Sequence, residues 1–384
     1  MRGTVIKRGN SWAVVVEIGR DPVTGKRVRK WHSGYRTKRD AERARIEILS
    51  RVDHGTYVSP DRRTVGGYLE GDWLPAVKAR LKASTWDSYS RNIRLHIAPE
   101  LGPIPLQALT ATRLNEFYAS LLDGGRCDGN GGLAPKTVRY LHGIIRKALA
   151  DAARWNLLQR NVADQADPPT TRSTAPEMQT WPAEDLARFL TFVAEDRLHG
   201  AWILAATTGI RRGEVLGLRW SDVDLDAARL SVRQTLVSVA YQPRFSTPKT
   251  PRSRRSISLD ATTVAALRAH RKRQLEERMA WGSAYQDSGL VVTREDGTLV
   301  HPDRFTQMFD KHVKHSKLPR IRLHDLRHTY ATLALAAGVH PKVVSERLGH
   351  ATVAFTLDVY SHAVPALQEE AADRVAALIF KPIR

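Results

Sequence analysis

The sequence of 384 residues has little that would stabilise it covalently or hold it in a bilayer. Cys127 is the only cysteine, which excludes an intrachain disulfide and a cysteine-based zinc site. The opening residues, MRGTVIKRGN, lack the apolar core of a signal peptide, and the uncharged stretch around Ala201 to Ile210 is too short to cross a membrane. We therefore expect a soluble protein of the cytoplasm with no membrane partner.

Acidic residues are scarce relative to basic ones. The chain has 60 Lys and Arg against 40 Asp and Glu, a formal net charge of +20 and a pI near 10.3. Such a charge attracts polyanions and predicts DNA binding that weakens as salt rises. Charge alone does not separate an enzyme from an architectural DNA-binding protein, or from a basic surface that binds nothing.

The length predicts two or three cores, and residues 1–60 form the first expected domain. A helix is expected from Thr37 to Val52, with Thr37 as N-cap and Asp40 three residues later. This segment has 14 basic and 6 acidic residues, a net +8. It suits a basic sheet that enters a DNA groove, with an oligomerisation or spacer module as the alternative. The expected strands are Gly3 to Arg8, Ser11 to Ile18 and Lys26 to Ser33.

Residues 64–166 change to helical periodicity and form the second expected domain. Pro135 sits where a first-turn proline is tolerated, and Ser84 with Asp87 marks another helix start. Basic residues on the exposed helix faces together suggest a helical DNA clamp. The core stripes are Leu114, Phe117, Tyr118 and Leu121, followed by Val138, Leu141, Ile145 and Leu149.

The Pro-rich and Thr-rich stretch from Asp167 to Pro182 predicts a linker, and residues 174–384 form the third expected domain. Lys249 is placed in a loop between two strands. The whole chain is therefore expected to be mainly α with small β elements. The third domain should contain helices 184–194 and 201–208, a helix opened by TGIRRGEVLGLRW, and strands 229–239 and 254–259.

A series of basic and imidazole groups precedes a tyrosine near the carboxyl end: Arg211, His324, Arg327, His350 and Tyr360. A phenol has a pKa of about 10 and is a poor nucleophile at neutral pH. It therefore needs a nearby base, and fixed positive charge where negative charge develops. Guanidinium groups supply that charge and match phosphate oxygens in shape. The combination predicts attack by a tyrosine on a phosphodiester, and hence a DNA strand-cutting enzyme.

Four ordered blocks carry a resemblance to the tyrosine recombinase family, the phage-type site-specific integrases. The stretch from about Glu184 to Ala363 contains TGIRRGEVLGLRWSDVD, TPKTPRSRRSISL, HDLRHTYATLALAAG and VSERLGHATVAFTLDVYSH. The whole chain also resembles integrases with an arm-type DNA-binding domain, a helical SAM-like core-binding domain and a catalytic domain. We expect residues 1–60, 64–166 and 174–384 to correspond to these three.

The resemblance implies a role for each main residue. Arg211 and Arg327 would clamp the scissile phosphate, His324 would accept the phenolic proton, and Tyr360 would form a 3′-phosphotyrosyl bond while freeing a 5′ hydroxyl. Because the protein linkage retains the bond energy, a 5′ hydroxyl of the partner strand can reverse the step. The implied reaction uses no ATP, no metal and no other cofactor. Tyr330, on the helix of Arg327, should pack rather than attack.

Three further residues match positions of the family, and each of them also has a simpler structural explanation. Lys249 would protonate the departing 5′ oxygen, or it is an ordinary loop lysine. His350 would donate a hydrogen bond to a phosphate oxygen, or it caps a helix end. Glu214 would orient the cations of the site, or it is a surface helix residue.

The resemblance also implies double-stranded DNA attachment sites as substrates and a homo-tetramer on two duplexes. The tail from Pro365 to Phe380 has helical spacing and either docks on a neighbouring protomer or packs within its own domain. A directionality factor or a host DNA-bending protein are further partners. The substrate would be a phage, an integrative plasmid or a conjugative element, integrated or excised at a specific site.

Three other classes of protein are alternatives to a recombinase. A metalloenzyme could use His324 and His328, which are four residues apart, but a HExxH glutamate and a third ligand are lacking. A type IB topoisomerase shares the tyrosine chemistry. A non-catalytic DNA-binding protein explains the charge and the helices, but gives no reason for the complete polar set.

Overall fold

The computed structural model describes residues 3–170, 179–247, 254–350 and 352–360, together with residues 376, 379 and 380. Within the last long segment, the side chains of residues 355 and 358–360 lie outside the description. The chain forms two compact units, Met1–Ala175 and Pro176–Arg384. No described helix is long and apolar enough to cross a membrane.

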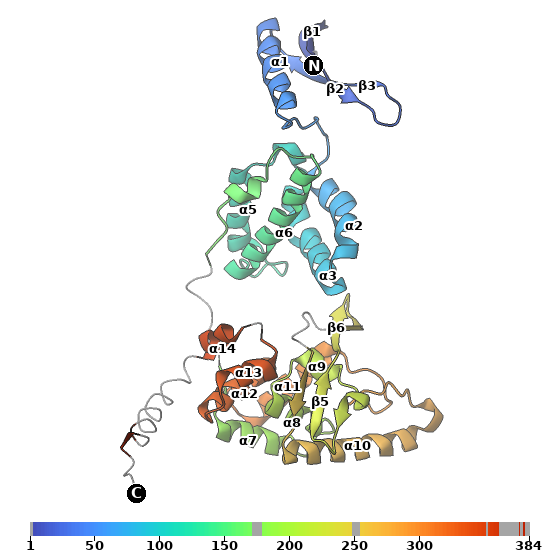
Figure 1. The fold of residues 1–384 in the computed structure, drawn as a ribbon, viewed down its shortest axis with the longest axis vertical. Coiled ribbons are helices and arrows are strands. Elements are labelled where there is room, and N and C mark those ends of the chain that lie inside the picture. The colour runs from blue at the N-terminus through green and yellow to red at the C-terminus, as the bar shows by residue number, and fades with distance from the viewer. Residues whose placement is uncertain are drawn as a thin grey trace. The chain divides into compact units, whose positions relative to one another are not determined.

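The first unit begins with a three-stranded antiparallel sheet and one helix, as predicted (Figure 1). Thr37 is the N-cap of the helix, because its hydroxyl accepts from the backbone N–H of Asp40 at 3.1 Å. Val14 and Val16 of the middle strand pack with Ala41 and Ile48 of the helix. The elements are β1 (Gly3–Arg8), β2 (Ser11–Arg20), β3 (Arg27–Tyr35) and α1 (Lys38–Asp53).

The other face of this sheet is basic and aromatic. Val15 pairs with Trp31 and Glu17 pairs with Arg29, so these side chains lie opposite the face that carries Val14 and Val16. The Arg8 guanidinium lies 5.8 Å from the Trp31 ring, which is half exposed. Cationic and aromatic side chains therefore share one accessible sheet surface.

The rest of the first unit is helical and has its own core. Every residue of the two predicted stripes is buried, and Pro135 occupies the first turn of its helix. One predicted start was wrong: the helix begins at Ala83 and Lys82 is its N-cap. Ser84 is already helical, so it does not cap the turn. The helices are α2 (Leu74–Val77), α3 (Ala83–Asn92), α4 (Ala98–Leu101), α5 (Ala111–Gly124) and α6 (Pro135–Arg154), with a π-helical stretch Gly67–Trp73 before α2.

The second unit is mostly helical around a buried helix, α8, whose neighbours include α10 and α12. Trp202 of α8 stacks on Phe305 of α11 at 4.4 Å between ring centres. The mainly α fold class with small sheets is confirmed. The helices are α7 (Ala183–Phe192), α8 (His199–Thr208), α9 (Arg212–Leu216), α10 (Ala261–Trp281), α11 (Pro302–Ser316), α12 (Asp325–Ala336), α13 (Pro341–Leu348) and α14 (Val353–Tyr360).

The strands of this unit differ from the expectation in two respects, the first being a short strand, Val223–Asp224, that was not expected. The single strand expected over 229–239 is two strands, and the second pairs with a further strand to form a hairpin where a loop was expected. The hairpin turn, Ala240 and Tyr241, has positive φ values of 49° and 60°. Neither residue type signals such a turn, so the sequence pattern missed it. The strands are β4 (Val223–Asp224), β5 (Arg229–Val232), β6 (Thr235–Val239), β7 (Gln242–Ser246) and β8 (Arg255–Ser258), with β4-β5-β8 in one sheet.

Candidate active site

Gly209, at the end of α8, packs closely against residues of α12 and α13. It ends α8 with a φ of +61°, and a Cβ there would lie 2.6 Å from Cδ1 of Tyr330 and 2.7 Å from Cδ2 of Leu348. Glycine is therefore required both for its backbone and for the space. Its carbonyl accepts from Nη1 of Arg327 at 2.8 Å, so the end of α8 is fixed to α12.

Arg211 follows two residues later as the N-cap of α9. Its backbone N–H donates to Oε2 of Glu214 at 2.9 Å, and its Nη1 donates to Oε1 of the same carboxylate at 2.9 Å. Glu214 is only 4 % exposed, whereas the Arg211 side chain is 39 % exposed. Burial alone would raise the pKa of Glu214, but Arg255 and Arg211 outweigh burial and lower that pKa below its ordinary value. The acid is therefore a buried, ionised partner and not a surface residue.

Arg255, the first residue of β8, is the second guanidinium partner of Glu214. Its Nη1 and Nη2 donate to the two carboxylate oxygens at 3.2 and 2.9 Å, a bidentate pair, and its side chain is 7 % exposed. Arg255 gave no separate signal in the sequence, because it lies within the arginine run TPRSRRS.

The carboxyl end of α13 is where three arginines meet. The consecutive carbonyl groups of Arg347, Leu348 and Gly349 accept from Arg255 Nε, Arg327 Nη2 and Arg211 Nη2. The last carbonyls of a helix lack partners within it and carry partial negative charge, so cationic donors are favourable there. Arg211 and Arg327, far apart in the sequence, are thus held at one point of the structure.

His324 is the N-cap of α12, directly before the helix that carries Arg327. Displacement of water around the ring, followed by the charge of Arg327 and with a further contribution from Arg211, lowers the pKa of His324 below its ordinary 6.5. The imidazole is therefore mainly neutral at pH 7, the form that accepts a proton. The ring of His328 lies 5.0 Å away, perpendicular to it, and burial lowers the pKa of His328 to about 4.

His350 lies in the turn after α13 and faces the next helix. Its Nδ1 lies 2.8 Å from the hydroxyl of Thr356, a fully buried residue of α14. Burial and the charges of Arg327 and Arg211 lower the pKa of His350 to about 3, so its ring is neutral at physiological pH. Thr356 had no signal in the sequence, since its role depends on a contact that only the folded turn creates.

Two of the expected residues are described only in part or not at all. Tyr360 is the last residue of α14, four positions after Thr356, so the two positions share a helix face. Its side chain lies outside the described residues, and so does the whole of Lys249. The expected tail, 365–380, is likewise outside them except for residues 376, 379 and 380. Tyr330 packs in the core as expected, and its hydroxyl accepts from Nε of Arg347 at 2.6 Å.

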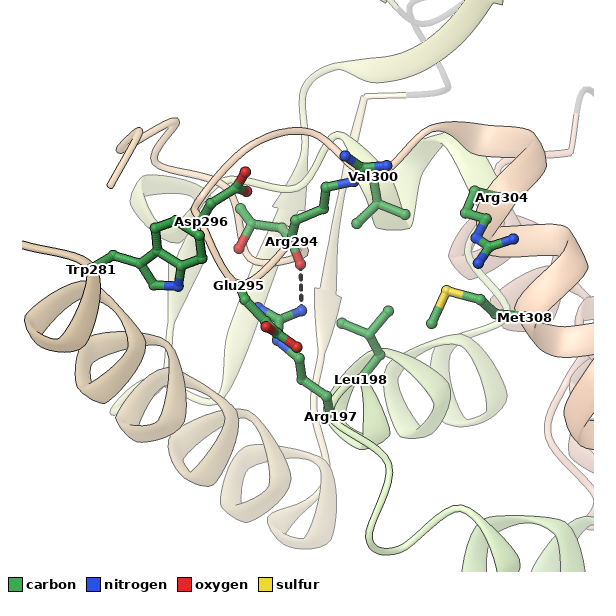
Figure 2. Close-up of a pocket in the computed structure, with 10 residues that line it drawn as sticks. Arg197, Leu198, Trp281, Arg294, Glu295, Asp296, Val300, Arg304 and Met308 are labelled. Atoms are coloured by element: carbon green, nitrogen blue, oxygen red, sulfur yellow. Dashed lines mark hydrogen bonds between the residues drawn. The ribbon is translucent and has the colours of Figure 1, made fainter. Parts of the chain in front are cut away.

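A separate pocket in the second unit shares no residue with this cluster. It encloses about 400 Å³ and includes Arg197, Trp281 and Met308 in its lining (Figure 2). Arg197 is bound on both sides of its fork by Glu277 and by the Thr293 carbonyl, so it is a structural ion pair. Among the described residues, no group of three or more His, Cys, Asp or Glu side chains is arranged to hold a metal ion.

Comparison with known families shows which family the segment that carries this cluster resembles. A model of the phage integrase family matches residues 182–366, which include Arg211, Arg255, Arg327, His350 and Tyr360. Residues 182–366 belong to this family, the tyrosine recombinases. An arm DNA-binding domain model matches residues 5–52, and a phage integrase N-terminal SAM-like domain model matches residues 70–122. The enzyme is therefore one that cuts and rejoins DNA strands.

Curated relatives agree with this assignment, and solved structures share the fold. A "tyrosine recombinase XerC-like" protein of Caldanaerobacter subterraneus is 28 % identical, covering 96 % of both chains. The ICEBs1 integrase of Bacillus subtilis is 27 % identical over 96 % of this chain and 97 % of its own. The Tn1549 transposon integrase, solved with a circular intermediate DNA, shares the fold with a TM-score of 0.65 and 21 % identity, covering 82 % of this chain and 99 % of that structure. Lambda integrase, solved as a tetramer on a Holliday junction, has a TM-score of 0.55 and 17 % identity over 91 % and 95 %.

Proposed function

We propose that the enzyme is a site-specific recombinase in which Tyr360 attacks a DNA phosphate. The observation that carries the proposal is the meeting of Arg211 and Arg327 at the carboxyl end of α13, directly before the turn into the helix that ends in Tyr360. Guanidinium charge and the expected nucleophile thus belong to adjoining segments.

The two arginines supply charge to the transition state. Arg211 donates to one backbone carbonyl through Nη2, and Arg327 donates to two through Nη1 and Nη2, so each planar fork has a fixed orientation before DNA arrives. Negative charge grows on the non-bridging oxygens as the phenolic oxygen attacks, and preoriented donors stabilise that charge without reorganising. In this reaction guanidinium groups take the part that a divalent ion plays in other phosphoryl transfers, so we propose no metal and no cofactor.

We assign the proton transfers to His324 and Lys249, and a hydrogen bond to the phosphate to His350. A neutral His324 accepts the phenolic proton, and the arriving phosphate, being negative, favours its protonated form. If the Thr356 hydroxyl donates to Nδ1 of His350, Nε2 carries the ring proton and can donate to a phosphate oxygen. We assign Lys249 as the acid that protonates the departing 5′ oxygen.

The covalent step then reverses on a second strand. Tyr360 is joined to the 3′ phosphate and a 5′ hydroxyl is released. The 5′ hydroxyl of the partner strand attacks the phosphotyrosyl bond and regenerates the phenol. No bond energy is lost to water, so we propose strand exchange without ATP.

We assign a role to each expected domain. Residues 1–60 would bind arm-type sites, residues 64–166 would grip the core site, and residues 174–384 would carry the chemistry. The names of the ICEBs1 and Tn1549 relatives support a mobile element as substrate, integrated or excised at attachment sites. The lambda tetramer supports a homo-tetramer on two duplexes. A directionality factor or a host DNA-bending protein would set the direction.

A covalent trap tests the reaction. A nicked suicide duplex is made from the DNA that flanks the gene. After cleavage the short fragment that carries the new 5′ hydroxyl dissociates, so the protein stays attached to the 3′ phosphate. The native protein should form an adduct that is absent for Tyr360→Phe, whereas an adduct with Tyr360→Phe would reject Tyr360. Arg211→Ala and Arg327→Ala should each slow adduct formation by roughly 10²- to 10³-fold while DNA binding is largely kept.

A further inference from the structure

We propose that Arg255 is a positioning residue for DNA cleavage: it pairs with Glu214 so that the charge of Arg211 stays available to the scissile phosphate. The inference rests on the proposed function and adds to it a residue that does not touch the DNA. The evidence is that two arginines bind the same buried carboxylate in different ways.

Glu214 receives four hydrogen bonds from two arginines. Arg255 contributes two through its fork, and Arg211 contributes one from its backbone and one from Nη1. The two guanidinium groups differ in exposure, because Arg255 is 7 % exposed and Arg211 is 39 % exposed. The buried Arg255 therefore binds the carboxylate through both terminal nitrogens of its guanidinium. The accessible Arg211 binds it through only one guanidinium nitrogen, Nη1.

The charge of the cluster depends on this arrangement. Three guanidinium groups, those of Arg211, Arg255 and Arg327, and one carboxylate, that of Glu214, sum to +2. Without Arg255 the sum would be +1, and Glu214 would keep Arg211 as its only guanidinium partner. A buried carboxylate that loses a partner draws the remaining one toward itself. Arg211 would then be neutralised by the protein, and less of its charge would act on DNA.

Arg255 also holds the segment that leads to α14. Its Nε donates to the Arg347 carbonyl, next to the carbonyl groups that bind Arg327 and Arg211. A Cβ at Gly349 would lie 3.1 Å from Nη1 of Arg255, so the backbone runs closely over this side chain. One residue thus sets both the charge near Arg211 and the position of the turn that precedes the nucleophile.

Arg268 offers a matched control in the same unit. Its Nη2 donates to a carboxylate, that of Asp226, and to a backbone carbonyl, that of Leu225. Like Arg255 it binds one carboxylate and one backbone carbonyl, but it does so through Nη2 alone, and the side chains of Arg268 and Asp226 are 55 % and 90 % exposed. An exposed pair contributes little to stability. Arg268→Gln therefore removes the same kind of group without touching the site.

The experiment measures the rate of covalent adduct formation on the suicide duplex in a single turnover, together with DNA affinity and Tm. Arg255→Gln should slow the adduct by roughly tenfold or more with DNA affinity within about twofold, and Arg268→Gln should stay near the native rate. The double variant Glu214→Gln with Arg255→Gln restores the sum of +2, so it should be faster than Arg255→Gln alone. A merely structural role predicts a double variant slower than either single one.

The outcomes separate the two proposals. If the native protein forms no adduct, the proposed function fails. If the native protein does, a native rate for Arg255→Gln or additive loss in the double variant overturns the role of Arg255. Should Arg255→Gln be unfolded at the assay temperature, Arg255→Lys decides, because it keeps the charge but offers no fork. Its rate should fall by about threefold or more, and a native rate would overturn the inference.

Discussion

The Nδ1 atom of His350 lies 2.8 Å from the hydroxyl oxygen of Thr356, so the turn after α13 is bound to the middle of α14. Thr356 is fully buried and lies four positions before Tyr360. The hydroxyl is therefore placed to fix both the tautomer of a neutral histidine and the position of the helix that ends in Tyr360, the proposed nucleophile.

Removing that hydroxyl should slow cleavage without preventing folding. Thr356→Val keeps the shape of the side chain but leaves Nδ1 of His350 without this partner, which costs about 1–3 kcal/mol when a buried group is left unpaired. We expect a fall of roughly tenfold in the adduct rate on the suicide duplex. Thr356→Ser retains the hydroxyl and should stay close to the native rate; equal loss in both variants would reject the hydrogen bond as the cause.

Cleavage should persist into weakly acidic solution. Because the pKa of His324 is lowered from 6.5, its ring stays neutral, and able to accept a proton, until the pH falls below 6.5. The adduct rate at limiting DNA, which reports the pKa of the free protein, should therefore show an acid-sensitive decline only below pH 6.5. His324→Gln should be slower at every pH and lack this acid-sensitive step, and an unchanged profile would remove His324 from the proton transfer.

Folding stability should also decline in acid because of His350 and His328. Their pKa values in the folded protein are about 3 and about 4, below the ordinary 6.5, so the unfolded chain binds protons first. Their contribution is complete above pH 6.5 and is lost as the pH falls toward 3. Tm measured from pH 7.5 to 4.5 should fall less steeply for His350→Gln than for the native protein. A parallel fall would mean that other groups dominate.

A methyl group at Gly209 should be much more damaging than one at another left-handed glycine. Gly338 has a φ of +76° with nothing within 4 Å of an added Cβ, so Gly338→Ala isolates the backbone cost of about 1–2 kcal/mol. Gly209→Ala adds contacts of 2.6 and 2.7 Å with Tyr330 and Leu348. We expect it to lower the free energy of unfolding by roughly 2 kcal/mol more than the control. Equal losses of unfolding free energy for the two variants in chemical denaturation would show that Tyr330 and Leu348 move aside without destabilising the fold.

The basic face of the N-terminal sheet should contribute to DNA affinity. Arg29 lies beside Trp31 on the face away from α1, whereas Arg43 is exposed on α1 itself. Arg29→Ala should weaken binding of the full chain to a long duplex and lower the slope of affinity against salt by about 1. Fluorescence anisotropy over a range of salt concentrations measures both, with Arg43→Ala as the control. If the slopes of DNA affinity against salt were indistinguishable for the two variants, the DNA would not contact this face of the sheet.

Local patterns in the sequence predicted the elements whose causes are local. Thr37 caps α1 because the cap and its N–H partner are three residues apart. The stripe Leu114, Phe117, Tyr118 and Leu121 is buried because helical spacing aligns it on one face. Motif spacing likewise selected Arg211 and Arg327, which the structure brings to one helix end.

The parts that escaped prediction depend on contacts and backbone conformations that no local sequence pattern indicates. Arg255 acquires its partners Glu214 and Arg347 only when β8, α9 and α13 meet. Thr356 depends on how the turn after α13 folds back. The β6–β7 turn adopts positive φ at Ala240 and Tyr241, residue types that seldom do so, and no local pattern announces it.

The ring of guanidinium groups around the end of α13 has a consequence for building chimeric enzymes. Its donors come from β8, α9 and α12, and its acceptors are three successive peptide oxygens. A splice point placed between residues 211 and 349 would take donors and acceptors from different parent proteins. Retargeting should therefore exchange the modules before residue 176 and transplant the remainder as one intact cassette.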